Sequence, residues 1–450
     1  MNSIIEQALP LPEIYFSPLG GYYRRESRGN FIPVNEGQAK SWLKEQGYSD
    51  RDDKDGVSEI ASVLLRVQNK QNIDFAGGLA GHTAGYYSMN GAPILVTNSP
   101  KLLERRPGEW PTLQHLLEAM FRDAEHDQLA YFNGWLKMAV EAVYGGNWQP
   151  SQVLVLAGPV ESCKSLLQQI ITEALGGRAA FAHNYFSGGS NFNGELFQAE
   201  HLMIEDEAEC ANLHERRSLG ARLKQVAVNR KHYCHAKNRQ PLSLEPIWRL
   251  SISLNDDPER LRLLPPLDPD IEDKLMLLKV SRPILPFLAS TSGEKERFWN
   301  TLMSELPAYL HYLMNWEIPP QMRVGRCGIR HFHHPELVMA LDTRSEVTTL
   351  LGLINREIWA HTEKPRSAWE GKAHDLIRRL DSTVGHLTQE ERALLKNAQT
   401  LGILLRRLQQ DKPRRISSKI RKGNQVWVIQ PPECELDPDT AQPPVGVGSA

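Results

Sequence analysis

The feature that most constrains this chain is an apolar strand that runs into a glycine-initiated loop and then into a helix. Residues 153–157 are all apolar, Gly158 begins the loop, and Lys164 and Ser165 open the next helix. This order is typical of a P-loop, in which loop amides and the helix N-terminus hold phosphates. The lysine then reaches the β- and γ-phosphates, and the hydroxyl holds Mg²⁺. Such a loop requires an α/β sheet that is covered on both faces.

One position of this loop departs from the usual pattern. The second glycine, which normally precedes the lysine, is Cys163 here. That glycine often adopts a positive φ, where a side chain with a Cβ costs about 1 kcal/mol. Either the loop tolerates the cysteine or nucleotide binding is weakened, and both outcomes stay open. The predicted nucleotide-binding residues are Gly158, Pro159, Val160, Glu161, Ser162, Cys163, Lys164 and Ser165.

A second short strand ends in three consecutive acids. Residues 201–204 are followed directly by Glu205, Asp206 and Glu207. A P-loop ATPase uses one carboxylate to hold the water shell of Mg²⁺ and another to position the attacking water. We favour Glu205 with Asp206 because Glu205 follows the strand directly. Asp206 with Glu207 is the alternative register.

A third apolar strand, residues 249–254, ends at Asn255. An amide at the tip of this strand can hydrogen-bond the γ-phosphate or the attacking water. The three motifs together predict one catalytic site and a Mg²⁺ ion that arrives with ATP, held by Ser165 and Asp206. The predicted catalytic residues are Lys164, Glu205, Asp206 and Asn255.

The motifs, packed into residues 158–255, resemble those of the superfamily 3 helicases, the hexameric AAA+ motors of small DNA viruses, phages and mobile elements. The helicase part of phage and plasmid primase-helicases is especially similar, over residues 150–285. The resemblance implies an α/β fold: an AAA+ P-loop ATPase core with an N-terminal α+β/helical region and a C-terminal winged-helix-like domain. It also implies ATP and Mg²⁺ as cofactors, a homo-hexamer, and ATP-dependent DNA unwinding in replication. Primase motifs are absent, which leaves room for a separate primase or polymerase as a partner.

The resemblance further implies a basic β-hairpin in the central pore of the ring. Residues 222–239 carry six Lys or Arg residues and no acid, with His232, Tyr233 and His235 among them. Such cations can follow a phosphate backbone, and an aromatic ring can stack on a base of single-stranded DNA. The predicted contacts are Lys224, Arg230, Lys231, His232, Lys237 and Arg239.

An arginine finger that completes the neighbouring subunit's ATP site is a second implied feature. Arg260 and Arg262 lie beyond Asn255 and have the right chemistry. Alignment with the family places the position at Lys274 instead, which would be an atypical finger. The three candidates stay open.

The C-terminal part has a separate basic segment. Residues 403–425 hold eight Lys or Arg residues and the single acid Asp411. Helices followed by a basic hairpin resemble a winged helix, which binds duplex DNA through helix and wing, although many such modules bind protein instead. The predicted contacts here are Arg414, Arg415, Lys419, Arg421 and Lys422.

Composition excludes several other classes. Lys and Arg (52) nearly balance Asp and Glu (54), the five cysteines are scattered, and the sequence has no apolar run of the ~20 residues that cross a bilayer. We therefore expect a cytoplasmic protein without a membrane partner or a disulfide scaffold. Histidines near Cys234 and Cys327 lack a zinc-like spacing, so we expect them in loops or facing DNA.

The pattern of turns and apolar residues divides the chain into six parts. Antiparallel strands are expected in residues 13–34, a helix capped by Asn35 follows, and Thr112 is the expected cap of a long helical stretch that ends at Gly145 and Gly146. The parts are an N-terminal α+β domain (1–110), a helical connector (111–148), the ATPase core (149–285), a mixed connecting region (286–372), the winged-helix-like domain (373–430) and a disordered tail (431–450).

Two other functions stay open at this stage. Cys163 favours a DNA-binding initiator or regulatory switch that binds nucleotide and hydrolyses it poorly. An assembly or defence protein could also reuse the ATPase core, but the basic residues 222–239 argue against that hypothesis. DNA-stimulated ATP hydrolysis distinguishes a motor from both.

Overall fold

The computed structural model divides into two compact units, residues 1–337 and 338–450. It describes residues 11–52, 56–205, 213–237, 240–261, 263–284, 291–342, 346–359, 367–381, 387–421 and 424–432. Four residues predicted to act at a site, Asp206, Arg239, Arg262 and Lys422, lie outside these ranges, as does most of the predicted tail.

The N-terminal part of the first unit holds two small sheets and two helices. As expected, residues 13–34 form an antiparallel meander, and Asn35 caps α1 in a reciprocal capping box with Gln38. The elements are β1 (Ile14–Ser17), β2 (Gly21–Arg25), β3 (Phe31–Val34), α1 (Glu36–Glu45), α2 (Glu59–Lys70), β4 (Phe75–Gly77), β5 (Gly85–Met89) and β6 (Ala92–Val96).

Two helices follow, α3 (Pro111–Met120) and α4 (Gln128–Gly145). The expectation that Thr112 caps the first of them is wrong, because Trp110 is the N-cap and Pro111 takes the first helical position. Proline suits that position, since its fixed φ matches the helix and its missing N–H has no partner to lose. Gly146 ends α4 at a φ of 62°, as the glycine pair predicts.

A five-stranded parallel sheet forms the centre of the first unit, in the order β13-β7-β12-β9-β8. The bounds of β7 (Val153–Ala157), β9 (His201–Ile204) and β12 (Arg249–Leu254) are those expected from the sequence. All three strands are buried along their whole length. The sheet gains β8 (Ala179–Phe181) and β13 (Leu275–Lys279) at its edges, and it fits a P-loop core.

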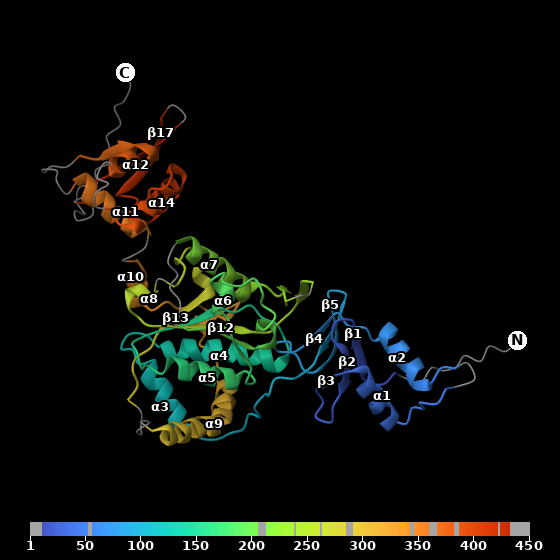
Figure 1. Ribbon diagram of the computed structural model, residues 1–450. Coiled ribbons are helices and arrows are strands. Elements are labelled where there is room, and N and C mark those ends of the chain that lie inside the picture. Colours follow the sequence, from blue (N-terminus) through green and yellow to red (C-terminus); the bar gives the residue numbers. More distant parts are fainter. Residues whose placement is uncertain are drawn as a thin grey trace. The chain divides into compact units, whose positions relative to one another are not determined.

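Helices cover both faces of this sheet, as Figure 1 shows. On one face α3, α4, α5 (Lys164–Ala174) and α9 (Ser292–Asn315) share a single apolar core with β7 and β13. On the other face lies α7 (Leu213–Val228), which packs against β12. Shorter elements complete the unit: α6 (His183–Phe186), β10 (His232–Cys234), β11 (Leu242–Leu244), α8 (Pro258–Leu261), β14 (Arg323–Val324) and β15 (Gly328–Ile329). The boundary between the two units falls within α10 (Pro335–Asp342).

The second unit has its own apolar core and an antiparallel sheet of order β16-β18-β17. The three helices and the hairpin expected after residue 373 are present, and the same core also includes Leu350 and Ile354 from further upstream. The elements are α11 (Glu346–Ile354), a π-helical turn (Asn355–Trp359), β16 (Trp369–Gly371), α12 (Ala373–Asp381), α13 (Gln389–Leu394), α14 (Ala398–Asp411), β17 (Ile416–Arg421) and β18 (Asn424–Ile429).

Among the residues that the structure describes, no helix combines the length and the apolar character that crossing a bilayer requires.

Candidate nucleotide site and basic surfaces

Strand register brings the three sequence motifs to one edge of the parallel sheet. Leu254 pairs with Ala157, so Asn255 and Gly158 leave their strands at the same level. Ile252 pairs with Ile204, which places Glu205 one strand further along the same edge. The carboxyl ends of parallel strands are where α/β sheets bind ligands.

The backbone of the loop has the conformation that its motif predicts. Cys163 is the N-cap of α5 with a φ of 61°, and Glu161 has a φ of 64°. Gly158 has no room for a side chain, because a Cβ there would lie 2.2 Å from the carbonyl oxygen of Val280. The loop is therefore held tightly against the end of β13. Glu161 and Cys163 adopt a left-handed backbone conformation, which costs free energy for a residue with a Cβ and not for glycine.

Lys164 connects the loop to Asn255. Its ammonium donates to the carbonyl oxygens of Gly158 and Pro159, both at 2.8 Å, and to the hydroxyl of Ser162 at 3.2 Å. Asn255 Oδ1 lies 3.3 Å from the same nitrogen. These four acceptors carry no net charge, and phosphate oxygens at this edge would be stronger acceptors.

A nucleotide with its Mg²⁺ fits the donor set at this edge. The loop offers a lysine ammonium and the N-terminus of α5, a helix of eleven residues, and the exposed Ser165 lies in the first turn. Glu205 is half-buried at the end of β9. The remaining predicted Mg²⁺ ligand, Asp206, is outside the described residues.

Cys163 is half-buried beside two cations. Burial raises the pKa of its thiol, and the charges of Arg282 and Lys164 act in the opposite direction without cancelling that effect. The group is therefore a neutral thiol at pH 7 and not an activated thiolate.

The finger candidates differ in exposure. Arg260 is exposed on α8, whereas Lys274 is buried in a short 3₁₀ turn (Glu272–Lys274) and its ammonium pairs with the neighbouring Asp273. A side chain that enters a neighbouring subunit's site has to leave its own surface. Arg260 lies at the surface, as such a contact requires, and Lys274 does not.

The basic hairpin is shorter than the sequence suggested. Residues 222–228 belong to α7, and the hairpin consists of β10 paired antiparallel with β11, which moves it to residues 232–244. Two cations of the predicted segment 222–239 have acidic partners outside that segment. Lys224 pairs with Asp270 at 3.1 Å, and Arg230 pairs with Glu245 at 2.7 Å.

Other members of this basic segment are also engaged. Lys231 donates to the amide oxygen of Asn90 and lies 4.0 Å from Glu245. His232 is turned inward: its Nε2 donates to the carbonyl oxygen of Asn229 at 2.9 Å, and its ring packs on Trp248. Burial lowers the pKa of His232. His232 is thus poorly placed to contact DNA in this conformation.

An exposed aromatic and basic group remains near the hairpin. Tyr233 is 73% exposed, Lys237 is exposed, and the ring of His235 lies 5.2 Å from that of Phe192. The sequence reasoning missed Phe192, which comes from the loop after α6 and is 48% exposed. Phe192, Cys234 and Lys237 line part of one cavity of about 430 Å³.

The C-terminal basic residues also separate into different environments. Arg415 is wrong as a DNA contact, because it is 1% exposed and its guanidinium lies over the ring of Trp359. Lys419 and Arg421 both pair with Glu370 of the added strand β16, at 2.6 and 2.7 Å. Arg414 is exposed.

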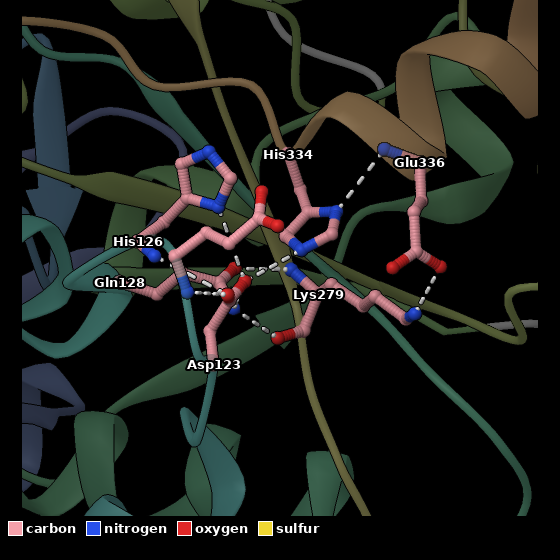
Figure 2. Close-up of polar contacts among 7 residues, drawn as sticks. Asp123, His126, Gln128, Lys279, His334 and Glu336 are labelled. Atoms are coloured by element: carbon pink, nitrogen blue, oxygen red, sulfur yellow. Dashed lines mark hydrogen bonds and ion pairs between the residues drawn. The ribbon is translucent and has the colours of Figure 1, made fainter.

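One histidine of the Cys327 segment has distant partners that its spacing could not reveal (Figure 2). His334 Nε2 lies 2.8 Å from Asp123 Oδ2, and His126 Nδ1 lies 3.5 Å from the same oxygen. These three groups are close enough to share a metal ion. Hydrogen bonds explain the His334–Asp123 contact without a metal, because Nδ1 of His334 accepts the Glu336 amide, so Nε2 carries the proton that Asp123 accepts.

Comparisons with known proteins support the fold of this chain, but they do not show its activity. No protein-family model matches the sequence, and no curated protein matches it. Among solved structures, the chain is similar to the A-form apo structure of the NrS-1 C-terminal region, with a TM-score of 0.53, 11% identity, and coverage of 93% of this chain and 96% of that one. A second apo structure, of NrS-1 residues 305–718, gives a TM-score of 0.54 at 12% identity and covers 93% and 95%. At this identity the likeness shows that the chain shares the fold of that region.

Proposed function

We propose that this protein is an ATP-dependent DNA translocase of the helicase type. The observation that carries the proposal is the meeting of Lys164 with Asn255 at the carboxyl edge of the central sheet, 3.3 Å apart, beside Glu205. The proposed phosphate-binding lysine and the proposed phosphate-sensing asparagine thus lie in contact, after the adjacent strands β7 and β12. The superfamily 3 order of these motifs supports the same proposal.

The residues at this edge have separable roles in hydrolysis. Bound Mg²⁺ would neutralise charge on the β- and γ-phosphates, and Ser165 with Asp206 would hold it. Lys164 exchanges its loop carbonyls for phosphate oxygens and offsets their negative charge. Glu205 accepts a proton from the attacking water, and Asn255 orients that water or the γ-phosphate.

A hexamer would complete the site and enclose the DNA. We favour Arg260 as the cation that reaches a neighbouring subunit, because Lys274 is buried. Tyr233 and Lys237 then provide the stacking and phosphate contacts of the hairpin to single-stranded DNA. Arg414 is the candidate for duplex contact in the winged-helix-like second unit, and a separate primase would supply primers.

Steady-state ATP hydrolysis with and without single-stranded DNA tests the proposal. We expect hydrolysis that rises with DNA and disappears in Lys164→Ala, since that change removes the cation that faces the phosphates. Asn255→Ala keeps the loop intact and should retain nucleotide binding while losing turnover. No hydrolysis above the Lys164→Ala background would contradict the motor function.

The left-handed Cys163 specifically favours one alternative, a nucleotide-dependent DNA-binding switch. Its φ of 61° places a strained residue where the usual glycine gives the loop freedom to adapt. DNA affinity that changes with bound nucleotide, in the absence of turnover, would support the switch.

A further inference from the structure

Arg282 lies over the phosphate-binding loop, although no motif predicts it. The residue follows the end of β13, the strand next to β7 on the side opposite Asn255. Its guanidinium forms an ion pair with Glu161, the loop residue with a φ of 64°. The loop therefore has a cation on each side: Lys164 toward Asn255 and Arg282 toward Glu161.

The backbone holds Arg282 at this position from two directions. The amide of Val280 donates to the carbonyl of Ala157 at 2.7 Å, and the amide of Ser281 donates to the carbonyl of Met120 at 2.7 Å. Val280 is also in direct contact with Gly158, as the close approach of its carbonyl shows. The backbone at Arg282 is thus fixed close to the first residue of the loop, while its side chain is 65% exposed.

A carboxylate such as that of Glu161 is unfavourable in a site for anions. A carboxylate in a phosphate-binding loop repels the ligand, and a left-handed backbone is costly for a residue with a Cβ. Pairing with Arg282 neutralises this charge when the loop is empty. Exposed ion pairs are weak, so a ligand with more negative charge can displace the carboxylate at little cost.

We propose that Arg282 binds the phosphates of the nucleotide held by its own chain, and that Glu161 competes with the nucleotide for it. In this arrangement nucleotide binding breaks the Glu161–Arg282 pair and transfers the guanidinium to phosphate oxygens, which it can contact in a bidentate manner. The proposal rests on the P-loop binding nucleotide, and it adds a phosphate ligand and a built-in competitor to that site.

The affinity of the full-length chain for methylanthraniloyl-ATP with Mg²⁺, measured at fixed ionic strength, tests both the phosphate contact of Arg282 and the competition by Glu161. We expect Arg282→Gln to weaken binding about tenfold, the size of one charge-assisted contact. We expect Glu161→Gln to tighten it about threefold to fivefold, the value of an exposed pair plus the lost repulsion. In the Arg282→Gln background, the gain in nucleotide affinity from Glu161→Gln should be smaller, because Glu161 no longer has a guanidinium to pair with.

Matched controls separate these effects from net charge. Arg28→Gln and Glu45→Gln remove the same charges from exposed positions of the N-terminal part and should leave the affinity within twofold. Arg282→Gln that binds as tightly as Arg28→Gln would overturn the phosphate contact. Equal Glu161→Gln gains in both backgrounds would overturn the competition. Failure of the underlying site is a different result, since the wild type would then bind no better than Lys164→Ala.

Discussion

Replacing Cys163 by glycine or by alanine isolates the strain in the phosphate-binding loop. The backbone at this residue has a φ of 61° and a ψ of 21°, which a residue with a Cβ occupies at a cost of about 1 kcal/mol. Both variants lose the half-buried thiol and its packing against the core, so that loss cancels when they are compared. Glycine alone escapes the strain. Cys163→Gly should therefore be more stable than Cys163→Ala by about 1 kcal/mol.

Thermal unfolding and nucleotide affinity read out this difference. A gain of about 1 kcal/mol corresponds to roughly 2 °C in the Tm of a unit of this size, with Cys163→Gly above Cys163→Ala. The glycine variant should also bind methylanthraniloyl-ATP more tightly, because its loop adapts to phosphate without added strain. Equal Tm values, or a higher one for Cys163→Ala, would refute the reasoning that the left-handed conformation is costly here.

Four further changes test other parts of the structure. Gly158→Ala should abolish nucleotide binding, measured with the same fluorescent ATP, because its Cβ would meet a backbone oxygen at 2.2 Å. Glu200→Gln should lower the free energy of unfolding in guanidinium chloride by about 3 kcal/mol, since it leaves Arg178 without its fully buried carboxylate partner. Hydrogen bonds from backbone amides lower the pKa of Asp123 to about 2, so its ionised form stabilises the fold above pH 4 and this contribution is lost as pH falls toward 2. Acid unfolding of Asp123→Asn should lack that component, and an unchanged acid profile would contradict it. Lys237→Ala should weaken single-stranded DNA binding and reduce its salt dependence, and unchanged values would exclude the hairpin contact.

The central strands could be predicted from sequence because burial on both faces favours short, mainly apolar segments. β7 is an uninterrupted apolar run that ends at Gly158, whereas in β12 the buried Arg249, Ser251 and Ser253 alternate with apolar residues before Asn255 ends the strand. At the sheet edges this signal is weaker. β8 has three residues, and Leu275–Lys279 of β13 is rich in residues that suit helices as well as strands.

The basic surfaces could be predicted less well, because charge counted along the chain ignores partners from elsewhere. Glu245 and Asp270 lie outside residues 222–239 and still neutralise cations within that window. Arg415 reads as a surface cation in a basic run, yet the aromatic ring of Trp359 covers it. Residue type gives the capacity to bind a phosphate, and only the fold decides whether the group is available for one.

The same limit explains why one side of the candidate site could be predicted and the other could not. Lys164 and Asn255 belong to motifs whose order along the chain indicates adjacent strands. Arg282 follows a strand that carries no motif, and it reaches the loop because β13 is the other neighbour of β7. The loop that follows β7 is flanked by the ends of β12 and β13, so a bound nucleotide could be contacted from both sides. Asn255 contacts Lys164, which we propose faces the phosphates, and loss of Asn255 should affect turnover. Arg282 pairs with a loop carboxylate, and its loss should affect affinity, which makes the two flanks experimentally separable.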